Sequence, residues 1–223
     1  MKVSSGPGSE ELQRIYKDRF EGRTDYRIEV WKVLASFFSK WVPSQGKVLD
    51  LGAGYCEFIN LIDAEVKYAM DLNPETAARA NESVLVLRQD CAQPWPFPPD
   101  SLDAVFTSNF LEHLPDKQAI CKTLLEAHRC LKPAGCLVAV GPNIKYVPGA
   151  YWDFFDHFVP LTELSLAEAM KNCGFTIESE IGRFLPYTMS TGRRYPSWTV
   201  KMYLACPWLW PLFGKQFLII GRK

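Results

Sequence analysis

The sequence predicts an α/β fold in which a mostly parallel sheet is covered by helices on both faces. Short apolar runs alternate with longer amphipathic stretches along most of the chain, which is typical of repeated β-α-β units. The run Val-Leu-Val-Leu within 83–88 has no polar face, as expected of a strand buried between two helical layers. A Gly-Ala-Gly turn follows the first apolar run, and open α/β sheets bind ligands at such turns.

The composition favours one folded domain. The 223 residues are 48% hydrophobic and 22% charged, which supplies enough apolar surface for a core and excludes a disordered chain. No apolar run approaches the ~20 residues of a membrane span, and the polar first ten residues differ from a signal peptide. We therefore expect a single domain, 1–223, made of N-terminal helices or a lid (1–46), a ligand-binding core (47–180), a substrate-side insertion (181–215) and a closing strand (216–223).

Cysteine and histidine usage predicts a reducing environment and no metal. The seven cysteines form no C-x-x-C pair and are odd in number, so we expect them to be small buried hydrophobic residues of a cytoplasmic protein. The three histidines include no H-E-x-x-H motif, and the sequence therefore predicts no metal site.

Charge is balanced overall but not along the chain. The sequence has 25 basic and 25 acidic residues, and Glu180 is the last acidic one. Seven basic residues follow it, so the last 43 residues carry +7 and the first 180 carry −7. We expect a positive surface that faces a phosphate or a lipid headgroup, with solvated side chains as the alternative. The zero net charge of the whole chain argues against a nucleic-acid partner.

The first half of the chain is predicted to contain helices at 10–20 and 25–42, strands at 47–51, 68–72, 83–88 and 102–108, and helices at 58–62 and after Asn73. In the second helix Trp31, Leu34 and Phe38 recur on one face at helical spacing. Asn73 followed by Pro74 suits a helix start. Four prolines within 94–99 predict a loop.

The second half is predicted to contain helices at 115–131 and 165–173 and strands at 136–140, 175–180 and 216–220. Ser165 and Glu168 have the spacing of a capping box, and Gly174 suits the end of that helix. The segment 181–215 shows no regular pattern and is expected to be irregular.

Carboxylates surround the predicted ligand turn. Gly52 and Gly54 permit close approach of a ligand to the backbone, and Asp71 lies 19 positions beyond Gly52, where a carboxylate can accept from ribose hydroxyls. Glu57 occupies the place of the third glycine of a dinucleotide motif. Asp50 would repel a pyrophosphate and suits a cationic ligand such as S-adenosylmethionine, which carries an ammonium and a sulfonium and no phosphate.

Four motifs in order resemble a known enzyme family. They are Val48-Leu-Asp-Leu-Gly-Ala-Gly54; Asp71; Gln89-Asp90; and Asp103-Ala-Val-Phe-Thr-Ser-Asn-Phe-Leu-Glu-His-Leu114, with Leu131-Lys-Pro-Ala-Gly-Cys-Leu-Val138 after them. Together they resemble a class I S-adenosylmethionine-dependent methyltransferase, most similar to the type 11 methyltransferase-domain family, over about 47–180. The resemblance implies a Rossmann-like, seven-stranded sheet with an antiparallel last strand.

The resemblance also implies the residues that hold the cofactor. The turn formed by Asp50, Gly52, Ala53 and Gly54 would line the methionine part; Asp71 would hold the ribose, with Leu72 beside the adenine; Asp90 would accept from the adenine amino group, with Cys91 beside it; and Asn109 would border the cofactor and the acceptor pocket. For Asp71, Asp90 and Asn109, a role as a capping or turn residue alone is the alternative.

Two histidines are candidate general bases. His113 follows the fourth strand and His157 follows the fifth, so both are expected at the ligand end of the sheet. Histidine titrates near neutrality, and a hydroxyl acceptor must lose its proton during methyl transfer. Packing at a helix start for His113, and lining of a pocket for His157, are the alternatives. The residues after Ser108 lack the Asn-Pro-Pro-Tyr type motif of amino-nitrogen methyltransferases.

The acceptor side is expected to comprise 141–160 and 181–215, with the N-terminal helices as a lid. Tyr16, Arg19 and Arg27 could reach the cofactor carboxylate from such a lid, or they could be surface or packing residues. The stretch 198–213 combines tryptophans with basic residues, so it either packs on the sheet edge or contacts a membrane or lipid-linked substrate.

The sequence thus predicts a cytoplasmic S-adenosylmethionine-dependent methyltransferase, with peripheral contact to the membrane through 198–213 as an open alternative. Its acceptor is expected to be a small-molecule or lipid-linked compound, with O-methylation of a sugar or similar metabolite favoured. The alternatives are a catalytically silent binding or scaffold protein and an NAD-dependent oxidoreductase.

Overall fold

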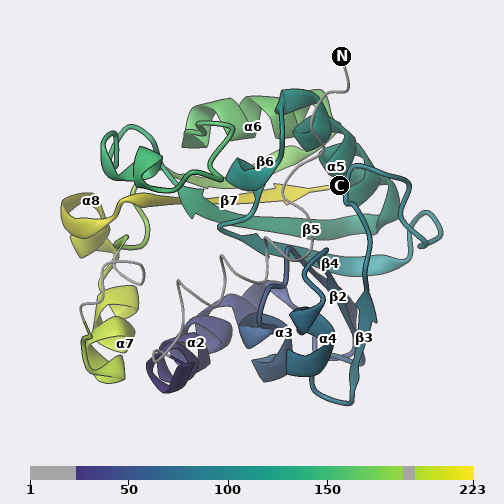
Figure 1. Ribbon diagram of the computed structural model, residues 1–223, viewed down its shortest axis with the longest axis horizontal. Helices are drawn as coiled ribbons and strands as arrows, with labels where there is room; N and C mark the ends of the chain where they lie inside the picture. The colour runs from purple at the N-terminus through teal and green to yellow at the C-terminus, as the bar shows by residue number, and fades with distance from the viewer. Residues whose placement is uncertain (1–23, 188–193) are drawn as a thin grey trace.

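A computed structural model describes residues 24–187 and 194–223 and contains the predicted α/β sheet (Figure 1). Its strands are β1 (Lys47–Leu51), β2 (Val66–Met70), β3 (Val84–Leu87), β4 (Leu102–Ser108), β5 (Leu131–Pro142), β6 (Thr176–Ile181) and β7 (Gln216–Arg222). Its helices are α2 (Thr24–Phe38), α3 (Glu57–Leu61), α4 (Glu75–Arg79), α5 (Lys117–Cys130), α6 (Glu163–Asn172), α7 (Ser197–Ala205) and α8 (Trp210–Phe213), with short 3-10 turns η1 (Ser39–Trp41), η2 (Leu111–His113), η3 (Ala150–Asp153) and η4 (Pro207–Leu209).

The seven strands form one sheet in the order β3-β2-β1-β4-β5-β7-β6. The pairs from β3 to β5 are parallel, and β7 lies antiparallel between β5 and β6. The predicted sheet with an antiparallel last strand is therefore confirmed. Because β1 lies between β2 and β4, the chain reverses its direction of travel across the sheet there, and this switch point is where ligands bind.

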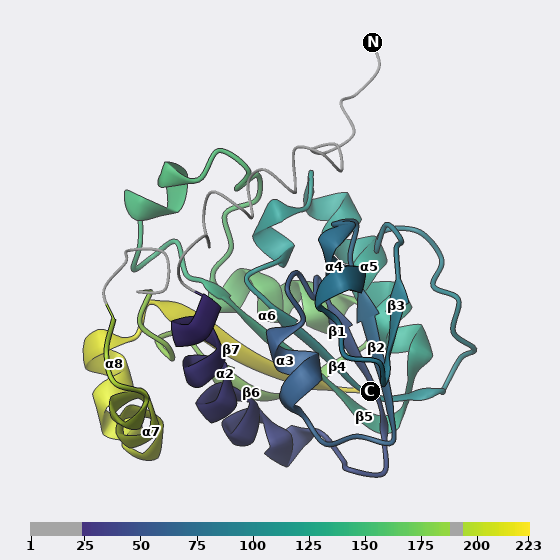
Figure 2. The same cartoon turned by 60° about the horizontal axis from the view of Figure 1, so that its bottom comes forward.

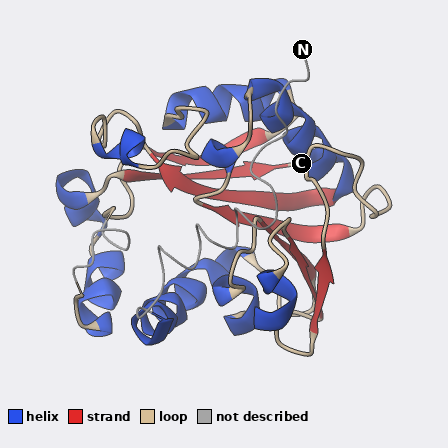
Figure 3. Cartoon of the chain, viewed as in Figure 1, coloured by secondary structure: helices blue, strands red, loops and turns tan. Residues whose placement is uncertain are grey.

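Two apolar cores lie on opposite faces of the sheet. Side chains of β1 alternate between them: Leu49 and Leu51 face the layer of α5 and α6, whereas Val48 faces the layer of α2 and α3. Figure 3 shows these two helical layers with the strands between them. Figure 2 shows α7 beside α2, where the buried side chain of Leu204 joins the same core. Both faces of the central strands are thus covered, as their apolar runs predicted.

Four sequence expectations about elements are wrong, three of them in the second half of the chain. The capping box of α6 is formed by Thr162 and Ser165, which exchange side-chain and backbone hydrogen bonds, so the helix begins before the predicted Ser165–Glu168 box. Strand β5 begins at Leu131 instead of residue 136, because residues 132–135 continue the strand past a register shift and the carbonyl of Gly135 accepts from Lys223 N. The segment 181–215, expected to be irregular, contains α7, η4 and α8.

The predicted second helix is also shorter than expected. It ends at Phe38, where the chain tightens into the 3-10 turn η1, instead of continuing to Val42. The predicted helix at 10–20 lies outside the described residues. Across 24–187 and 194–223, no helix is both long and apolar enough to cross a membrane.

Candidate active site

The turn after β1 is tied to the end of β2 and takes an unusual backbone form. Gly52 and Gly54 have positive φ angles of 71° and 51°, which glycine adopts without steric cost. The N–H groups of Gly52 and Ala53 donate to the carbonyl of Met70 at 2.9 and 3.3 Å. A Cβ at Gly52 would lie 2.1 Å from Cγ of Phe110, so a larger residue cannot fit. In this structure the ring of Phe110 lies over Gly52, and the approach of a ligand to this backbone stays a prediction.

The carboxylate of Asp71 is fixed by backbone donors on both sides. Its Oδ2 accepts from Gly54 N at 2.7 Å, and its Oδ1 accepts from Asn73 N at 2.8 Å. Burial raises the pKa of Asp71, while these hydrogen bonds and the charge of His113 oppose the shift. Each carboxylate oxygen can accept a second hydrogen bond, so a fixed Asp71 can still bind two hydroxyls of a ligand.

Asp50 lies inside the molecule, between β1 and α3, with 4% of its surface exposed. Burial raises its pKa well above the ordinary value, the charges of Glu57 and Asp71 raise it further, and a backbone hydrogen bond from Ile59 opposes them. The turn therefore carries a concentration of carboxylates. Ionised carboxyl groups attract a cationic ligand and repel a pyrophosphate. The preference of this turn for a cationic ligand stays a prediction.

The predicted adenine-side residues differ in exposure. Leu72 is 45% exposed, which leaves an apolar side chain at the ligand edge of β2. Asp90 is exposed, and its Oδ1 accepts from Ala92 N at 2.9 Å, so it shapes the turn after β3. Cys91 is buried, with its thiol in contact with Thr123 Oγ1 at 3.3 Å, and burial raises its pKa to about 12. Only the backbone of Cys91 can therefore line a pocket at this edge.

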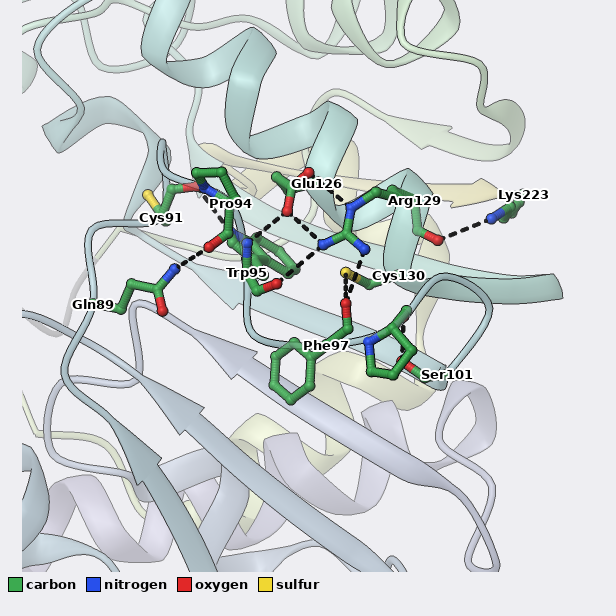
Figure 4. Close-up of polar contacts among 11 residues, drawn as sticks. Gln89, Cys91, Pro94, Trp95, Phe97, Ser101, Glu126, Arg129, Cys130 and Lys223 are labelled. Atoms are coloured by element: carbon green, nitrogen blue, oxygen red, sulfur yellow. Dashed lines mark hydrogen bonds and ion pairs between the residues drawn. The ribbon is translucent and has the colours of Figure 1, made fainter.

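A polar network holds the proline-rich loop that follows Asp90 (Figure 4). Arg129 donates to the carbonyls of Trp95 and Phe97 at 3.1 and 2.8 Å, and it pairs with Glu126 at 2.6 Å. Glu126 in turn accepts from Trp95 N at 2.6 Å, and the indole N–H donates to the carbonyl of Cys91 at 2.9 Å. Figure 4 shows Glu126 and Arg129 against this loop. Helix α5 thus fixes the turn that presents Asp90.

Asn109 ends β4 in a left-handed conformation, with φ of 50°. Its N–H donates to the carbonyl of Val140 at 2.9 Å, and its side-chain amide donates to Ser108 Oγ at 3.1 Å. Asparagine tolerates this backbone form better than most residues. The local geometry accordingly gives Asn109 a turn role, and its partly buried side chain lies at the ligand edge.

Both predicted histidines belong to one cluster beyond the end of β4. The rings of His113 and His157 meet edge to face with 4.8 Å between their centroids. Glu112, which is 2% exposed, places Oε1 4.0 Å from His113 Nε2. One ligating atom from each of these three residues lies within 4.8 Å of the others. The structure therefore brings together two loops that the sequence analysis treated separately.

Asp156 fixes the ring of His113. His113 Nδ1 lies 2.8 Å from the backbone carbonyl oxygen of Asp156 and 3.2 Å from its Oδ2. A carbonyl oxygen only accepts, so Nδ1 carries a proton, and in the neutral ring Nε2 keeps its lone pair. Burial lowers the pKa of His113, but the hydrogen bond to Asp156 and the charge of Glu112 outweigh it and raise the pKa above its ordinary value.

The cluster lies next to the turn that follows β1. Phe110, whose ring covers Gly52, precedes η2 in the chain. The charge of His113 also lowers the pKa of Asp71, so the two groups lie within electrostatic range. The carboxylate-rich turn and the histidine cluster are therefore two parts of one ligand edge.

Sequence reasoning missed two members of this edge. Glu112 was part of a recognised motif, yet its burial against both histidines depends on the loop at 154–159, which lies far away in the chain. Phe110 was also within that motif, but nothing in its neighbours indicates contact with Gly52. The only available signal was the juxtaposition of Glu112 with His113.

Of the three residues predicted to lie on the lid, Tyr16 and Arg19 are outside the described residues. Arg27 lies on α2 and pairs with Glu57 at 2.6 Å, both side chains being nearly buried. Arg27 thus joins α2 to the first turn of α3, beside the ligand turn.

The aromatic segment 198–213 is only partly packed against the rest of the molecule. Trp210 is partly buried and packs against Phe184 with 5.0 Å between ring centroids. Trp198 and Trp208 are 60% and 70% exposed. Packing on the sheet edge is therefore correct for Trp210 and wrong for the other two tryptophans. Further exposed apolar side chains on this segment are Met202, Leu212 and Phe213, and its exposed basic neighbours are Arg194, Lys201 and Lys215.

The residues at this edge fit S-adenosylmethionine. A buried carboxylate held at the end of β2 can accept from ribose hydroxyls, and the exposed Leu72 offers an apolar contact for a base. The carboxyl groups of Asp71 and Glu57 lie near this turn, and ionised carboxyl groups attract a ligand whose methionine part carries positive charge.

Comparisons with known proteins agree with this geometry. A family model described as a methyltransferase domain matches residues 23–180. A search of curated proteins gives no significant match. Among solved structures, an S-adenosylmethionine-dependent methyltransferase from Archaeoglobus fulgidus is similar at 21% identity, with 95% of this chain and 99% of that chain covered and a TM-score of 0.67.

Two other solved structures show how widely this fold is used. An S-adenosylmethionine-dependent methyltransferase from Thermotoga maritima is similar at 17% identity, covers 96% of this chain and 97% of its own, and has a TM-score of 0.66. The [4+2]-cyclase SpnF is similar at 16% identity, covers 99% and 98%, and also has a TM-score of 0.66. At these identities the likeness establishes the fold alone.

Proposed function

Because the chain belongs to the methyltransferase-domain family, the class I S-adenosylmethionine-dependent methyltransferases, we propose that it methylates a hydroxyl oxygen of a small or lipid-linked acceptor. A sugar or a similar metabolite is the acceptor that we favour. The observation that carries this proposal is the buried histidine cluster beside the cofactor turn. A hydroxyl must lose a proton during methylation, and this cluster supplies nitrogen bases there.

In this proposal the cofactor lies along the ends of β1, β2 and β3. Asp71 accepts hydrogen bonds from the ribose, Leu72 contacts the adenine, and Asp90 accepts from the adenine amino group. The turn at 50–54 binds the methionine part through its backbone, because the carboxylate of Asp50 is buried. When bound, S-adenosylmethionine supplies a methyl group activated by the positive sulfonium.

The histidine cluster then orients and activates the acceptor. Asp156 holds Nδ1 of His113 in its protonated form, so Nε2 is the atom that can take a hydroxyl proton. His157 packs against His113 and lines the same site. The remaining contribution of the chain is alignment and exclusion of water, which account for much of the rate in methyl transfer.

The exposed aromatic and basic side chains of 198–213 support a lipid-linked acceptor. Tryptophans whose rings are 60% and 70% exposed, next to lysines and with no acidic residue beyond Glu180, match the composition of a peripheral membrane contact. This surface would place the enzyme at the headgroup layer, where a lipid-linked sugar is presented.

Two measurements test the proposal in sequence. Calorimetry should show binding of S-adenosylhomocysteine by the purified chain and no binding of NAD. A methyl-donor assay against hydroxylated metabolites and glycolipids should then identify an acceptor. Binding of S-adenosylhomocysteine without turnover on any acceptor would favour the catalytically silent alternative. Where an acceptor is found, unchanged methylation by His113→Ala and by His157→Ala would rule out a histidine base.

A further inference from the structure

We propose that Glu112, His113 and His157 form a binding site for a divalent transition-metal ion. This inference goes beyond methyl transfer, because it concerns an additional ligand of the chain and can be tested without any acceptor. It departs from the sequence expectation of no metal site, which rested on the lack of a local histidine motif.

The donor atoms have the required composition and proximity. One carboxylate oxygen and two imidazole nitrogens lie within 4.8 Å of one another. His113 Nε2 and Glu112 Oε1 are already 4.0 Å apart. A bound ion with ligand distances of about 2.0–2.2 Å would draw them closer by roughly an ångström, which side-chain rotation can supply.

His113 has the partner that a metal-binding histidine needs. Metal-ligating imidazoles usually donate their second ring N–H to a carbonyl or a carboxylate, which fixes the tautomer and the ring orientation. His113 Nδ1 does so to Asp156, whose backbone oxygen and carboxylate lie at 2.8 and 3.2 Å. The lone pair of Nε2 is thereby directed to the side where Glu112 lies.

The backbone holds the two contributing segments together before any ion binds. The carbonyl of Glu112 accepts from Phe158 N at 2.9 Å and from Val159 N at 3.2 Å. The hydroxyl of Tyr151 donates to the carbonyl of Val159, and its ring packs edge-on against His157. The positions of the ligating residues are therefore determined by the fold, so ion binding pays little ordering entropy.

Burial strengthens the case for a cation. Glu112 is 2% exposed and His157 is 5% exposed. A carboxylate placed in a low-dielectric interior is stabilised by a positive ion beside it. Three protein ligands also leave coordination positions for water or a substrate oxygen.

The donor set indicates which ions bind. Two imidazoles and one carboxylate suit Zn²⁺, Co²⁺, Mn²⁺ or Fe²⁺, whereas Mg²⁺ and Ca²⁺ prefer sites made of oxygen alone. We therefore expect Zn²⁺ and Co²⁺ to bind in preference to Mg²⁺.

The ion also changes the role of His113 in the proposed function. Nε2 cannot coordinate a metal and accept a proton at once, so a bound ion would activate the acceptor by coordinating its oxygen. This consequence rests on the proposed function, whereas the binding of the ion does not.

The test is titration of the chelator-treated full chain with Co²⁺, followed by visible absorbance and by calorimetry. One Co²⁺ should bind per chain, with the absorbance of a site that contains nitrogen ligands. Glu112→Gln and His157→Asn should each weaken binding by about tenfold or more, and Asp156→Asn should weaken it about tenfold. His128→Asn is the matched control, because His128 packs against Phe175 away from the cluster and should bind Co²⁺ like the original protein.

Two results would overturn the proposal: no saturable binding of Co²⁺, or equal binding by the Glu112→Gln, His157→Asn and original proteins. Should the variants fail to fold, the thermal midpoint of the original chain decides, because an ion that binds only the native state must raise it. Zn²⁺ should raise the midpoint more than Mg²⁺, and equal midpoints would refute the site. S-adenosylhomocysteine binding by the metal-free chain, measured in parallel, separates failure of this proposal from failure of the proposed function.

Discussion

The two halves of the ligand edge are built in different ways. At the ends of β1 and β2, neighbouring backbone groups fix the carboxylate of Asp71: the N–H groups of Gly54 and Asn73 donate to it. At the ends of β4 and β5, side chains from distant segments hold one another, as His113 and Asp156 do. The first half depends on a local turn, and the second depends on correct packing of two loops.

This difference predicts how each half responds to mutation. A change in the turn should act through backbone strain and should affect both stability and cofactor binding. A change in the histidine cluster should leave cofactor binding largely intact.

Gly52→Ala should produce the largest loss. A left-handed backbone costs an alanine about 1–2 kcal/mol, and a Cβ within 2.1 Å of Phe110 adds an overpacking cost of about 1–3 kcal/mol. Denaturant unfolding should therefore show a destabilisation of roughly 2–5 kcal/mol. In a background that already carries Phe110→Ala, Gly52→Ala should lose less unfolding free energy, because only the cost of the left-handed backbone is left. If Gly52→Ala costs the same unfolding free energy in both backgrounds, the contact with Phe110 is unimportant.

Asp71→Ala should reduce cofactor affinity strongly. It removes two hydrogen bonds from a ribose to a charged group, worth about 2–4 kcal/mol in S-adenosylhomocysteine binding. Asp90→Ala is the comparison within the same half of the edge. It should cost about 1 kcal/mol, because Asp90 is exposed and its hydrogen bond is weakened by water. Calorimetry would contradict the ribose role if Asp71→Ala bound S-adenosylhomocysteine like the original chain.

Sequence reasoning succeeded where a residue's role depends on its immediate neighbours. The glycine turn, the position of Asp71 at the end of β2 and the buried parallel strands all follow from short patterns, and the structure has them. The α6 capping box was assigned wrongly, because Thr162 and Ser165 compete with Ser165 and Glu168 for the same helix start. Propensity cannot choose between two adjacent caps of similar quality.

The histidine cluster could not be predicted to the same depth. Both histidines were placed at the correct edge, but their contact depends on how the loop at 150–159 folds back over η2. The difference in burial between the tryptophans of 198–213 was unpredictable for the same reason. Trp210 packs in the core and Trp208 does not, although they lie two residues apart in one apolar segment. Long-range packing, which one sequence does not encode in a local pattern, decides these cases.

Replacing Trp198 and Trp208 together by Ser should weaken membrane contact. If their exposed rings enter the headgroup layer, the double variant should lose about tenfold or more in co-sedimentation with anionic vesicles. Leu125→Ser, an exposed apolar change on α5, should sediment like the original chain. Equal sedimentation of all three proteins would remove the support for a lipid-linked acceptor.

Glu126→Gln should change the free energy of unfolding least, and the pH dependence of that change tests whether the charge of Glu126 causes it. The hydrogen bond from Arg129 lowers the pKa of Glu126, burial opposes it, and the bond from Trp95 N lowers it further. A carboxyl whose pKa is lower in the folded state stabilises the fold above its unfolded pKa and loses that contribution as the pH falls. Urea unfolding at neutral pH should therefore show a loss of about 0.5–1 kcal/mol for the variant. This difference in unfolding free energy between the variant and the original chain should disappear in acid, below the pKa that Glu126 has in the folded state. Glu65→Gln, an exposed control, should show no such difference at either pH. A difference that persists in acid would mean that Glu126 acts through packing and not through its charge.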